Sequence, residues 1–204
     1  MSERRHLQLP LSDDDVLSLH AGDMIYLSGD ILTARDTAHK YMVEQLIKGH
    51  NSSETKLHAK LKRILARGAL YHCGPVTQRV NDQWRILSAG PTTSMREEIY
   101  EHLVMKHFDV SAIIGKGGMG EQTLAACRQV PAVYLHAPGG CAAYIASHIS
   151  KVIDVYKLEF GSPEAMWHIQ INDLPLMVTM DAHGMSWHQI IAERSASVYQ
   201  KGRS

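Results

Sequence analysis

Four short apolar runs in the middle of the chain constrain its fold more than any other feature. Each run is five or six residues long, too short for a helix and typical of a buried strand. The runs lie at residues 69–73, 84–89, 110–115 and 132–137. Helix-length segments lie between and after them, at residues 94–107, 122–129 and 141–151. Strands that alternate with helices, but are in places joined by turns alone, predict an α/β fold with a mixed sheet.

The rest of the chain extends this pattern in both directions. Ser12 precedes three aspartates, which is typical of a helix N-terminus, and the segment 35–48 has apolar residues at helical spacing. A strand is predicted at residues 24–27 and is expected to end at Ser28-Gly29. Three strands and a last helix are predicted further on, at residues 152–158, 168–171, 176–180 and 187–199. No linker rich in proline, glycine or serine divides the chain, which predicts a single domain over residues 1–204.

Composition argues against several classes of protein. The chain has 204 residues, with 21 lysines and arginines against 21 aspartates and glutamates, and this balance disfavours binding to nucleic acid through bulk charge. No apolar run approaches the roughly 18 residues of a membrane span, and none follows the N-terminal arginines as in a secretory signal. We therefore expect a soluble, cytoplasmic protein that binds neither nucleic acid nor membrane.

A basic amphipathic segment over residues 48–68 leaves two interpretations open. Its leucines and isoleucine form one stripe, while lysines and arginines dominate the remaining faces. Such a helix can bind a membrane surface or a partner protein. A surface helix with a solvated basic face is the more common case and is the interpretation that we favour.

The segment GKGGMG at residues 115–120 matches the glycine pattern of a dinucleotide-binding turn. A dinucleotide site also needs an acidic residue at the end of the next strand, but the next acid after the run 132–137 is Asp154. A P-loop is disfavoured because no Gly-Lys-Ser/Thr is present. What remains is a glycine-rich turn in which the backbone and Lys116 can approach an anion. The glycines alone are equally compatible with a tight turn that binds nothing.

The segment AGPTTSMREE at residues 89–98 also carries groups that suit an anion. Hydroxyl groups and free backbone N–H groups at a helix start precede Arg96, a combination that can bind a carboxylate or phosphate. An ordinary helix cap by Thr93 or Ser94 explains the same residues, and taken alone this segment favours that interpretation slightly.

The segment SGDILTARDTAHK at residues 28–40 brings Arg35, Asp36 and His39 close together. Arg35 and His39 share one face if the segment is helical, because they are four residues apart. An Arg35–Asp36 pair at a helix start beside an ordinary histidine is the simpler alternative. A functional interpretation requires this segment to meet the other two in space.

Together and in this order, these segments resemble the β subunit of L(+)-tartrate dehydratase and, equally, the C-terminal half of class I fumarase. The resemblance covers most of the chain, in the blocks GDMIYLSGDILTARDTAHK, YHCGP, SAGPTTSMRE, GKGGMG, PGGCAA, GSPEAMW and MDAHG. Its most specific part is the pair GPTTSxR and GKGGMG. The segment 48–68 departs from the family because it is longer and more basic than expected.

The resemblance implies a swivelling β/β/α domain and an iron–sulfur-dependent hydro-lyase that dehydrates a hydroxy-dicarboxylate. Conversion of tartrate to oxaloacetate and interconversion of malate and fumarate both remain open. The resemblance places a [4Fe–4S] cluster on a partner α subunit, so the working protein is expected to be a hetero-oligomer. For the chain alone, a homodimer is an open alternative.

The resemblance also assigns roles to individual residues. Substrate contacts are implied for the residues that match the family's motifs, which are Arg35, Thr92, Thr93, Arg96 and Lys116. Thr92 matches the group implicated in proton abstraction, and His39 is the second candidate for acid–base work. Cations suit this chemistry, because removing a proton beside a carboxylate builds negative charge on that carboxylate.

Neither the cysteines nor the 13 histidines predict a metal site on this chain. Cys73, Cys127 and Cys141 are widely spaced, without a CxxC group, so they do not form a disulfide framework and we expect no cluster ligands among them. Two histidine pairs invite a zinc interpretation, but each pair is five residues apart and therefore off a single helix face. These pairs are His183 with His188 and His102 with His107.

A second function from a different class remains open. The chain is then a standalone module that binds a dicarboxylate or a phosphorylated ligand through Lys116 and Arg96, without catalysis. Tight ligand binding by the isolated chain favours this module, whereas a need for the partner favours the hydro-lyase.

Overall fold

The computed structural model describes residues 5–49 and 54–201 of the chain. Its α-helices are α1 (Asp13–Leu17), α2 (Asp36–Tyr41), α3 (Thr55–Leu65), α4 (Glu98–Phe108), α5 (Glu121–Gln129), α6 (Ala142–Ser147) and α7 (Trp187–Lys201). A π-helix (Met42–Ile47) continues α2, and 3-10 turns lie at Ser94–Glu97 and Leu158–Phe160. The strands are β1 (Arg5–Gln8), β2 (Met24–Thr33), β3 (Ala69–Tyr71), β4 (Val76–Val80), β5 (Gln83–Ser88), β6 (Ala112–Gly115), β7 (Val133–His136), β8 (Ile149–Tyr156) and β9 (Met166–Met180).

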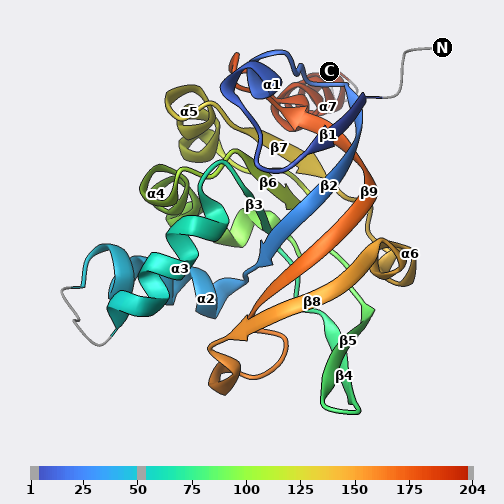
Figure 1. Cartoon of the computed structure of the whole chain (residues 1–204). Coiled ribbons are helices and arrows are strands. Elements are labelled where there is room, and N and C mark those ends of the chain that lie inside the picture. The colour runs from blue at the N-terminus through green and yellow to red at the C-terminus, as the bar shows by residue number, and fades with distance from the viewer. Residues whose placement is uncertain (1–4, 50–53, 202–204) are drawn as a thin grey trace.

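Five strands close into a barrel-like mixed sheet, so the predicted α/β class with a mixed sheet is confirmed. Strands β2, β3, β6 and β7 are parallel neighbours in that order. Strand β9 runs antiparallel to both β7 and β2 and thereby closes the ring. Strand β1 adds to β2, β8 adds to β9, and β4 and β5 form a separate hairpin that projects from the barrel (Figure 1).

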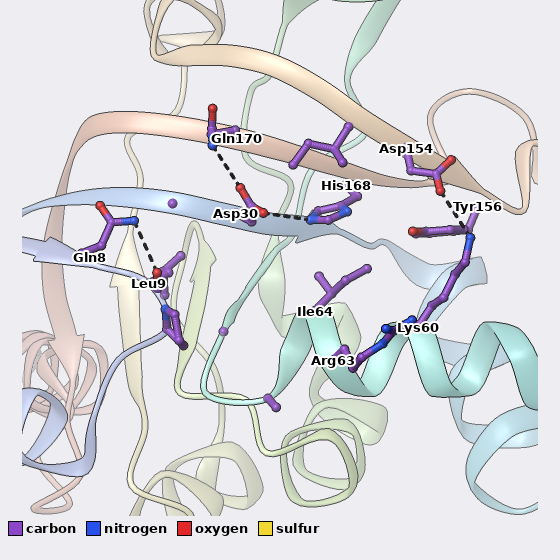
Figure 2. A pocket seen from close by; sticks show the side chains of 15 residues that line it. Gln8, Leu9, Asp30, Lys60, Arg63, Ile64, Asp154, Tyr156, His168 and Gln170 are labelled. Carbon is purple, nitrogen blue, oxygen red and sulfur yellow. Dashed lines mark hydrogen bonds and ion pairs between the residues drawn. The ribbon is translucent and has the colours of Figure 1, made fainter.

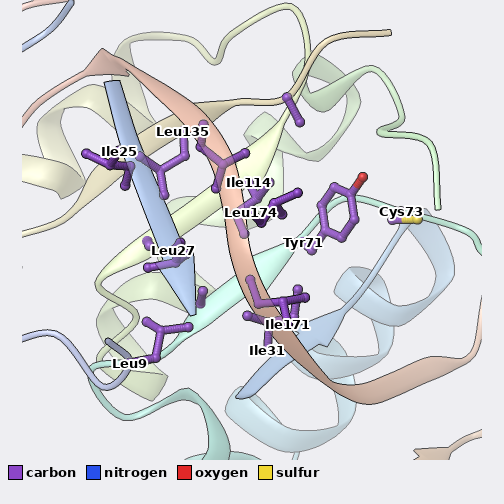
Figure 3. Packing of buried hydrophobic residues seen from close by; sticks show 14 of the residues in the cluster. Leu9, Ile25, Leu27, Ile31, Tyr71, Cys73, Ile114, Leu135, Ile171 and Leu174 are labelled. Carbon is purple, nitrogen blue, oxygen red and sulfur yellow. The ribbon is translucent and has the colours of Figure 1, made fainter. Parts of the chain in front are cut away.

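The alternation of side chains along the parallel strands explains the two layers of the core. In β3, Ala69 and Tyr71 point into the barrel with the first buried cluster, while Leu70 joins the second cluster beneath the helices. In β6, Ile114 points inward and Ile113 outward in the same way. Successive side chains of a strand face opposite sides, so a continuous apolar run buries both faces. Figure 3 shows the inner cluster, and helices α2 to α5 cover the outer one (Figure 1).

Strand β9 corrects the prediction of separate strands at 168–171 and 176–180. It is one strand of 15 residues, of which the stretch from His168 to Met177 pairs with β2. The register shifts between Leu27 and Gly29, and the Asp173 N–H donates to Ser28 Oγ at 2.8 Å instead of a ladder carbonyl. Polar residues that are typical of turns therefore form a β-bulge here. For the same reason β2 does not end at Ser28-Gly29, as predicted, but continues to Thr33.

Three further differences concern short elements. Strands β1 and β4 have no counterpart in the prediction, because each is short and largely exposed. The helix predicted over 141–151 ends at Ser147, and the chain enters β8 at Ile149. The last predicted helix and the helix start at Ser12 are confirmed, with the Ser12 and Asp15 side chains forming a capping box.

The basic segment forms α3, which supports its interpretation as a surface helix. Leu61 and Leu65 are fully buried against the outer cluster, while the helix's lysines and Arg63 are exposed. Residues 50–53 of this segment lie outside the described residues. Within the part of the chain that the structure describes, no helix has both the length and the apolar character needed to cross a membrane.

Candidate functional site

The carboxyl ends of the four parallel strands lead directly into the segments singled out by the sequence. Arg35 follows β2, His72 follows β3, Lys116 follows β6, and Gly139 lies in the turn after β7. Parallel neighbours end at one edge of a sheet, and α/β proteins gather their ligand-binding groups there. The strand order therefore brings together loops that are up to about a hundred residues apart in sequence.

Backbone hydrogen bonds join these loops. The Thr92 N–H donates to the His72 carbonyl at 2.8 Å, and the Ser94 N–H donates to the Lys116 carbonyl at 3.0 Å. Thr93 and Lys116 form an isolated parallel bridge. The turn that carries the two threonines therefore lies against the glycine-rich turn, as a shared site requires.

The three cations of the predicted site differ in their partners. Arg35 Nε lies 3.3 Å from Glu164 Oε1, and Arg96 lies 3.3 Å from Asp36 Oδ2. The Arg96–Asp36 pair connects the threonine turn to the start of α2. Lys116 forms no ion pair with any of the described residues, and it lies beside Gly139, where an added Cβ would be 3.9 Å from Nζ.

The two threonines do not act as an ordinary helix cap. Thr93 occupies the cap position of the 3-10 turn at 94–97, but its side chain makes no capping hydrogen bond and is exposed. Thr92 Oγ1 donates to the His72 carbonyl at 3.1 Å, which leaves its lone pairs free to accept. Ser94 is fully buried and accepts a hydrogen bond from the Tyr134 hydroxyl at 2.8 Å. Both threonine hydroxyls can therefore interact with a ligand.

The glycine-rich turn has a backbone that requires glycine. Gly117 and Gly118 have φ values of +83° and +76°, which residues with a side chain rarely adopt. The Glu98 carboxylate, at the start of α4, fixes the C-terminal end of this turn. It accepts hydrogen bonds from the backbone N–H groups of Gly120, Gln122 and Thr123. The turn is therefore an ordered loop held between α4 and α5.

His39 lies beneath this site and has no exposed surface. Its Nε2 lies 2.9 Å from Glu101 Oε2, and its Nδ1 lies 2.9 Å from the Arg35 carbonyl oxygen. His72 Nε2 lies 2.8 Å from the same Glu101 oxygen. The carboxylate of Glu97 is also fully buried. The sequence interpretation missed His72, Glu97 and Glu101, although Glu97 and Glu101 share a helix face at a spacing of four residues.

Burial and charge give these groups unusual acidities. Burial raises the pKa of Glu97 to about 7, with Asp36 and Glu101 adding to the effect against His39 and Arg96. Burial alone would also raise the pKa of Glu101, but the charges and hydrogen bonds of His72 and His39 outweigh it and lower the pKa to about 2. Burial opposes a charged His39, yet Glu101 more than compensates, so the pKa of His39 is raised.

The cysteines do not fit a cluster site. Cys73 and Cys127 are fully buried, and burial raises the pKa of each thiol to about 12, which disfavours the thiolate that binds iron. In residues 5–49 and 54–201, no cysteine belongs to a group of three closely spaced metal-ligating side chains. Each histidine of the two zinc pairs has its own hydrogen-bond partner. His183 contacts the Leu17 carbonyl oxygen, and His188 contacts Thr179 Oγ1. His102 contacts the Glu98 carbonyl oxygen, and His107 contacts His58.

A groove of about 600 Å³ lies elsewhere, between α3 and strands β1, β2, β8 and β9 (Figure 2). Two of its acidic side chains have a nitrogen nearby, as Lys60 Nζ lies 3.6 Å from Asp154 and His168 Nε2 lies 3.5 Å from Asp30. None of the predicted site residues lines it. The groove is therefore separate from the site at the strand ends.

The sequence pattern described as fumarase C-terminus matches residues 2–191 of the chain. The chain belongs to the fumarase C-terminus family. A provisionally named β subunit of L(+)-tartrate dehydratase from Methanocaldococcus jannaschii is 43% identical over 193 residues, covering 94% of this chain and 93% of the relative. The corresponding β subunit from Escherichia coli K12 is 32% identical over 191 residues, covering 93% and 88%.

A longer relative belongs to the same family. A provisionally named class I fumarate hydratase from Geobacillus stearothermophilus is 42% identical over 197 residues. The match covers 95% of this chain but only 36% of that protein. Family members therefore occur both as separate subunits and as part of a longer chain, and the activities in their names add or remove water.

Proposed function

We propose that the chain is the β subunit of an iron–sulfur-dependent hydro-lyase that dehydrates a hydroxy-dicarboxylate. Tartrate conversion to oxaloacetate and malate–fumarate interconversion are the two candidate reactions. The main support is a backbone bridge between Thr93 and Lys116, which joins the threonine turn to the glycine-rich turn. Both turns match motifs of the family. We further propose that residues 1–204 act as one domain of the swivelling β/β/α type, since the closed mixed sheet with its helical layer fits that description.

The proposed substrate contacts follow from charge. A dicarboxylate carries two negative charges, which Arg35, Arg96 and Lys116 can bind from different loops. Lys116 is best placed to meet a new anion because no described acidic side chain pairs with it, whereas the two arginines are already held in place by Glu164 and Asp36. Thr93 adds an exposed hydroxyl donor.

Thr92 is the proposed group for proton abstraction. Its hydroxyl donates to the His72 carbonyl, which favours the protonated form, so Thr92 must first lose this proton before it can take one from the substrate. A threonine is a poor base in water and needs a nearby cation, such as Lys116, to lower its pKa. His39, the second candidate for acid–base work, is fully buried and can affect the reaction only through the groups that it contacts.

We also propose that the chain works with a partner α subunit. The β-subunit names of two relatives support a hetero-oligomer with an α subunit. We propose that this partner holds the [4Fe–4S] cluster, because the cysteines of the present chain do not fit one. Such a cluster supplies a Lewis acid for the departure of hydroxide.

Site variants in the assembled two-subunit enzyme test the proposal. Lys116→Met and Arg96→Met are each expected to lower kcat/KM by at least about 100-fold, because each removes a charge that stabilises the developing anion. Thr92→Val is expected to lower kcat far more than it raises KM. Lys151→Met, an exposed change on β8, is the matched control and should leave turnover unchanged. Normal turnover by the Lys116 variant would contradict the site assignment.

The alternative is a module that binds without catalysis. Isothermal titration of the isolated chain with tartrate, malate and a phosphate ester separates the two functions. Weak or absent binding supports the subunit of a hydro-lyase. Tight binding to the chain alone, together with an assembled complex that has no dehydratase activity, would establish the binding module instead.

A further inference from the structure

His39, His72 and Glu101 form a buried cluster directly beneath the strand ends. None of the three side chains has exposed surface, and the Nε2 atoms of both histidines lie within 2.9 Å of the same Glu101 oxygen. Among the described residues, this is the one group of three or more His, Cys, Asp or Glu side chains close enough to hold a metal ion. The positions of the protons decide between a metal site and a hydrogen-bonded ion network.

The partners of His39 determine where its protons are. The Arg35 carbonyl oxygen, 2.9 Å from Nδ1, can only accept a hydrogen bond, so Nδ1 carries a proton. Nε2 faces the Glu101 carboxylate, an acceptor when ionised, so Nε2 carries a proton as well. His39 is therefore an imidazolium that is paired with Glu101 and shielded from water. The other charged groups around it are Glu97, whose Oε2 lies 3.9 Å from Nδ1, with Asp36 and Arg96 beyond.

His72 is neutral in the same cluster. Burial lowers the pKa of His72, and its Nε2–H donates to the Glu101 oxygen that His39 also contacts. Its Nδ1 is then an unprotonated acceptor, buried and without a hydrogen-bond partner among the described residues. This atom lies against Gly115, where an added Cβ would come within 3.2 Å of it and would overlap Ser94 Oγ. The overlap with Ser94 leaves room only for glycine at the residue that precedes Lys116.

The interatomic distances favour the ion network over a metal site. Nitrogen and oxygen ligands about 2.0–2.1 Å from a tetrahedral zinc ion lie roughly 3.3 Å from one another. The N···O separations here are 2.8 and 2.9 Å, which are hydrogen-bond distances. A metal would also need the Nε2 lone pairs, and the protons already occupy them.

The network is connected to two of the proposed site residues through their backbones. His39 Nδ1–H holds the Arg35 carbonyl, and the His72 carbonyl accepts from both the N–H and the hydroxyl of Thr92. We propose that His39, Glu101 and His72 are positioning residues that hold Arg35 and Thr92 in place for the reaction. This inference rests on the proposed function, because those two residues matter only if the site binds and dehydrates a substrate.

The first test observes the protons directly. Nitrogen-15 NMR of histidine-labelled full-length chain at pH 8 is expected to show both ring nitrogens of His39 protonated and only Nε2 of His72 protonated. A neutral His39 at pH 8 would overturn the inference. So would a stoichiometric metal ion with unprotonated Nε2 atoms on both histidines. This result does not depend on any enzymatic activity.

The second test uses Glu101→Gln in the assembled enzyme, with Glu121→Gln as an exposed control on α5. Without the Glu101 charge, burial lowers the pKa of His39, so at high pH His39 is neutral and keeps a single ring proton. The introduced amide and the Arg35 carbonyl then compete for that proton, which weakens the hold of the His39 ring on the Arg35 carbonyl. We expect kcat/KM to fall about 100-fold at pH 8, which is typical of a misplaced catalytic group, and to fall much less at pH 6. An equal loss at both values would indicate a packing role only and would overturn the inference.

The two tests separate the possible failures. If the wild-type complex has no dehydratase activity while the NMR result holds, the proposed function fails and the network remains. If Glu101→Gln does not fold, the protonation of His39 in the wild-type chain still decides the inference.

Discussion

At the scale of single residues, the proposed site combines side chains that the sequence indicates with side chains that only the structure brings together. Thr92 and Lys116 can be proposed from the sequence because they stand in short motifs next to proline and glycine, and Arg35 because it lies close to Asp36 and His39. Glu101 cannot, because a glutamate on a helix is usually solvated. Only its contacts with His72 and His39 give it a role, and these residues are 29 and 62 positions away in sequence. Such long-range pairs depend on the complete fold.

Glu97 provides a test of buried charge at this scale. Neither of its carboxylate oxygens has a hydrogen-bond partner among the described residues, and burial raises its pKa from 4.5 to about 7. A raised carboxyl pKa favours folding while the group is protonated, and this contribution is lost as the pH rises through about 7. Wild type is therefore expected to lose stability between pH 5 and pH 8 at this position.

The substitution Glu97→Gln removes the charge and keeps the shape. We expect the melting temperature of the variant, relative to wild type, to be about 2–4 °C higher at pH 8 than at pH 5, since about 1 kcal/mol corresponds to such a shift in a chain of this size. Thermal unfolding of the isolated chain at both pH values measures it. A difference that does not change with pH would contradict an ionised Glu97 at pH 8.

At the scale of elements, the short apolar runs were predicted well because their length and composition leave few alternatives. Each of the four runs overlaps an observed strand, and the three runs that form parallel strands are buried on both faces. The strand predictions were wrong where polar residues belong to the paired strands. Ser28 and Asp173 form the bulge between β2 and β9, and their residue types are typical of turns when the partner strand is unknown.

The Glu98 side chain connects the start of α4 to the start of α5. The Glu98 carboxylate accepts from three backbone N–H groups at the start of α5 and from the Thr123 hydroxyl at 2.7 Å. Glu98→Ala leaves these donors without that acceptor, and we expect the free energy of unfolding to fall by about 2 kcal/mol, the usual cost for bonds to a charged group. Urea denaturation measures the change.

A matched substitution separates this effect from a general loss of charge. Glu121→Ala removes an exposed carboxylate from the first turn of α5 itself. It is expected to change the free energy of unfolding by no more than about 0.5 kcal/mol, as surface substitutions usually do. Equal losses in the two variants would show that Glu98 acts through the helix dipole alone.

At the scale of the whole molecule, the closed barrel places the proposed site residues at one end. Strands β2, β3, β6 and β7 end together, and their loops carry Arg35, His72 and Lys116 to the same rim. Thr93 and Arg96 remain exposed at that rim, as do the apolar side chains of Met95 and Ile99 beside them. Closure of the ring through β9 was not predictable, because β9 pairs on one side with β7 and on the other with β2, whose paired residues are 136 to 153 positions earlier in the sequence.

The final prediction concerns assembly. Because none of the three cysteines fits a cluster site, the chain purified alone is expected to contain no iron–sulfur cluster, to be colourless and to have no dehydratase activity. Addition of a cluster-loaded α subunit should give turnover and a stable complex, since subunit pairs of this kind usually bury more than about 1,000 Å². Iron analysis, visible absorption and a dehydratase assay of the separate and mixed subunits measure these outcomes. Turnover by the isolated chain, before any partner is added, would contradict the division of the active site between two subunits.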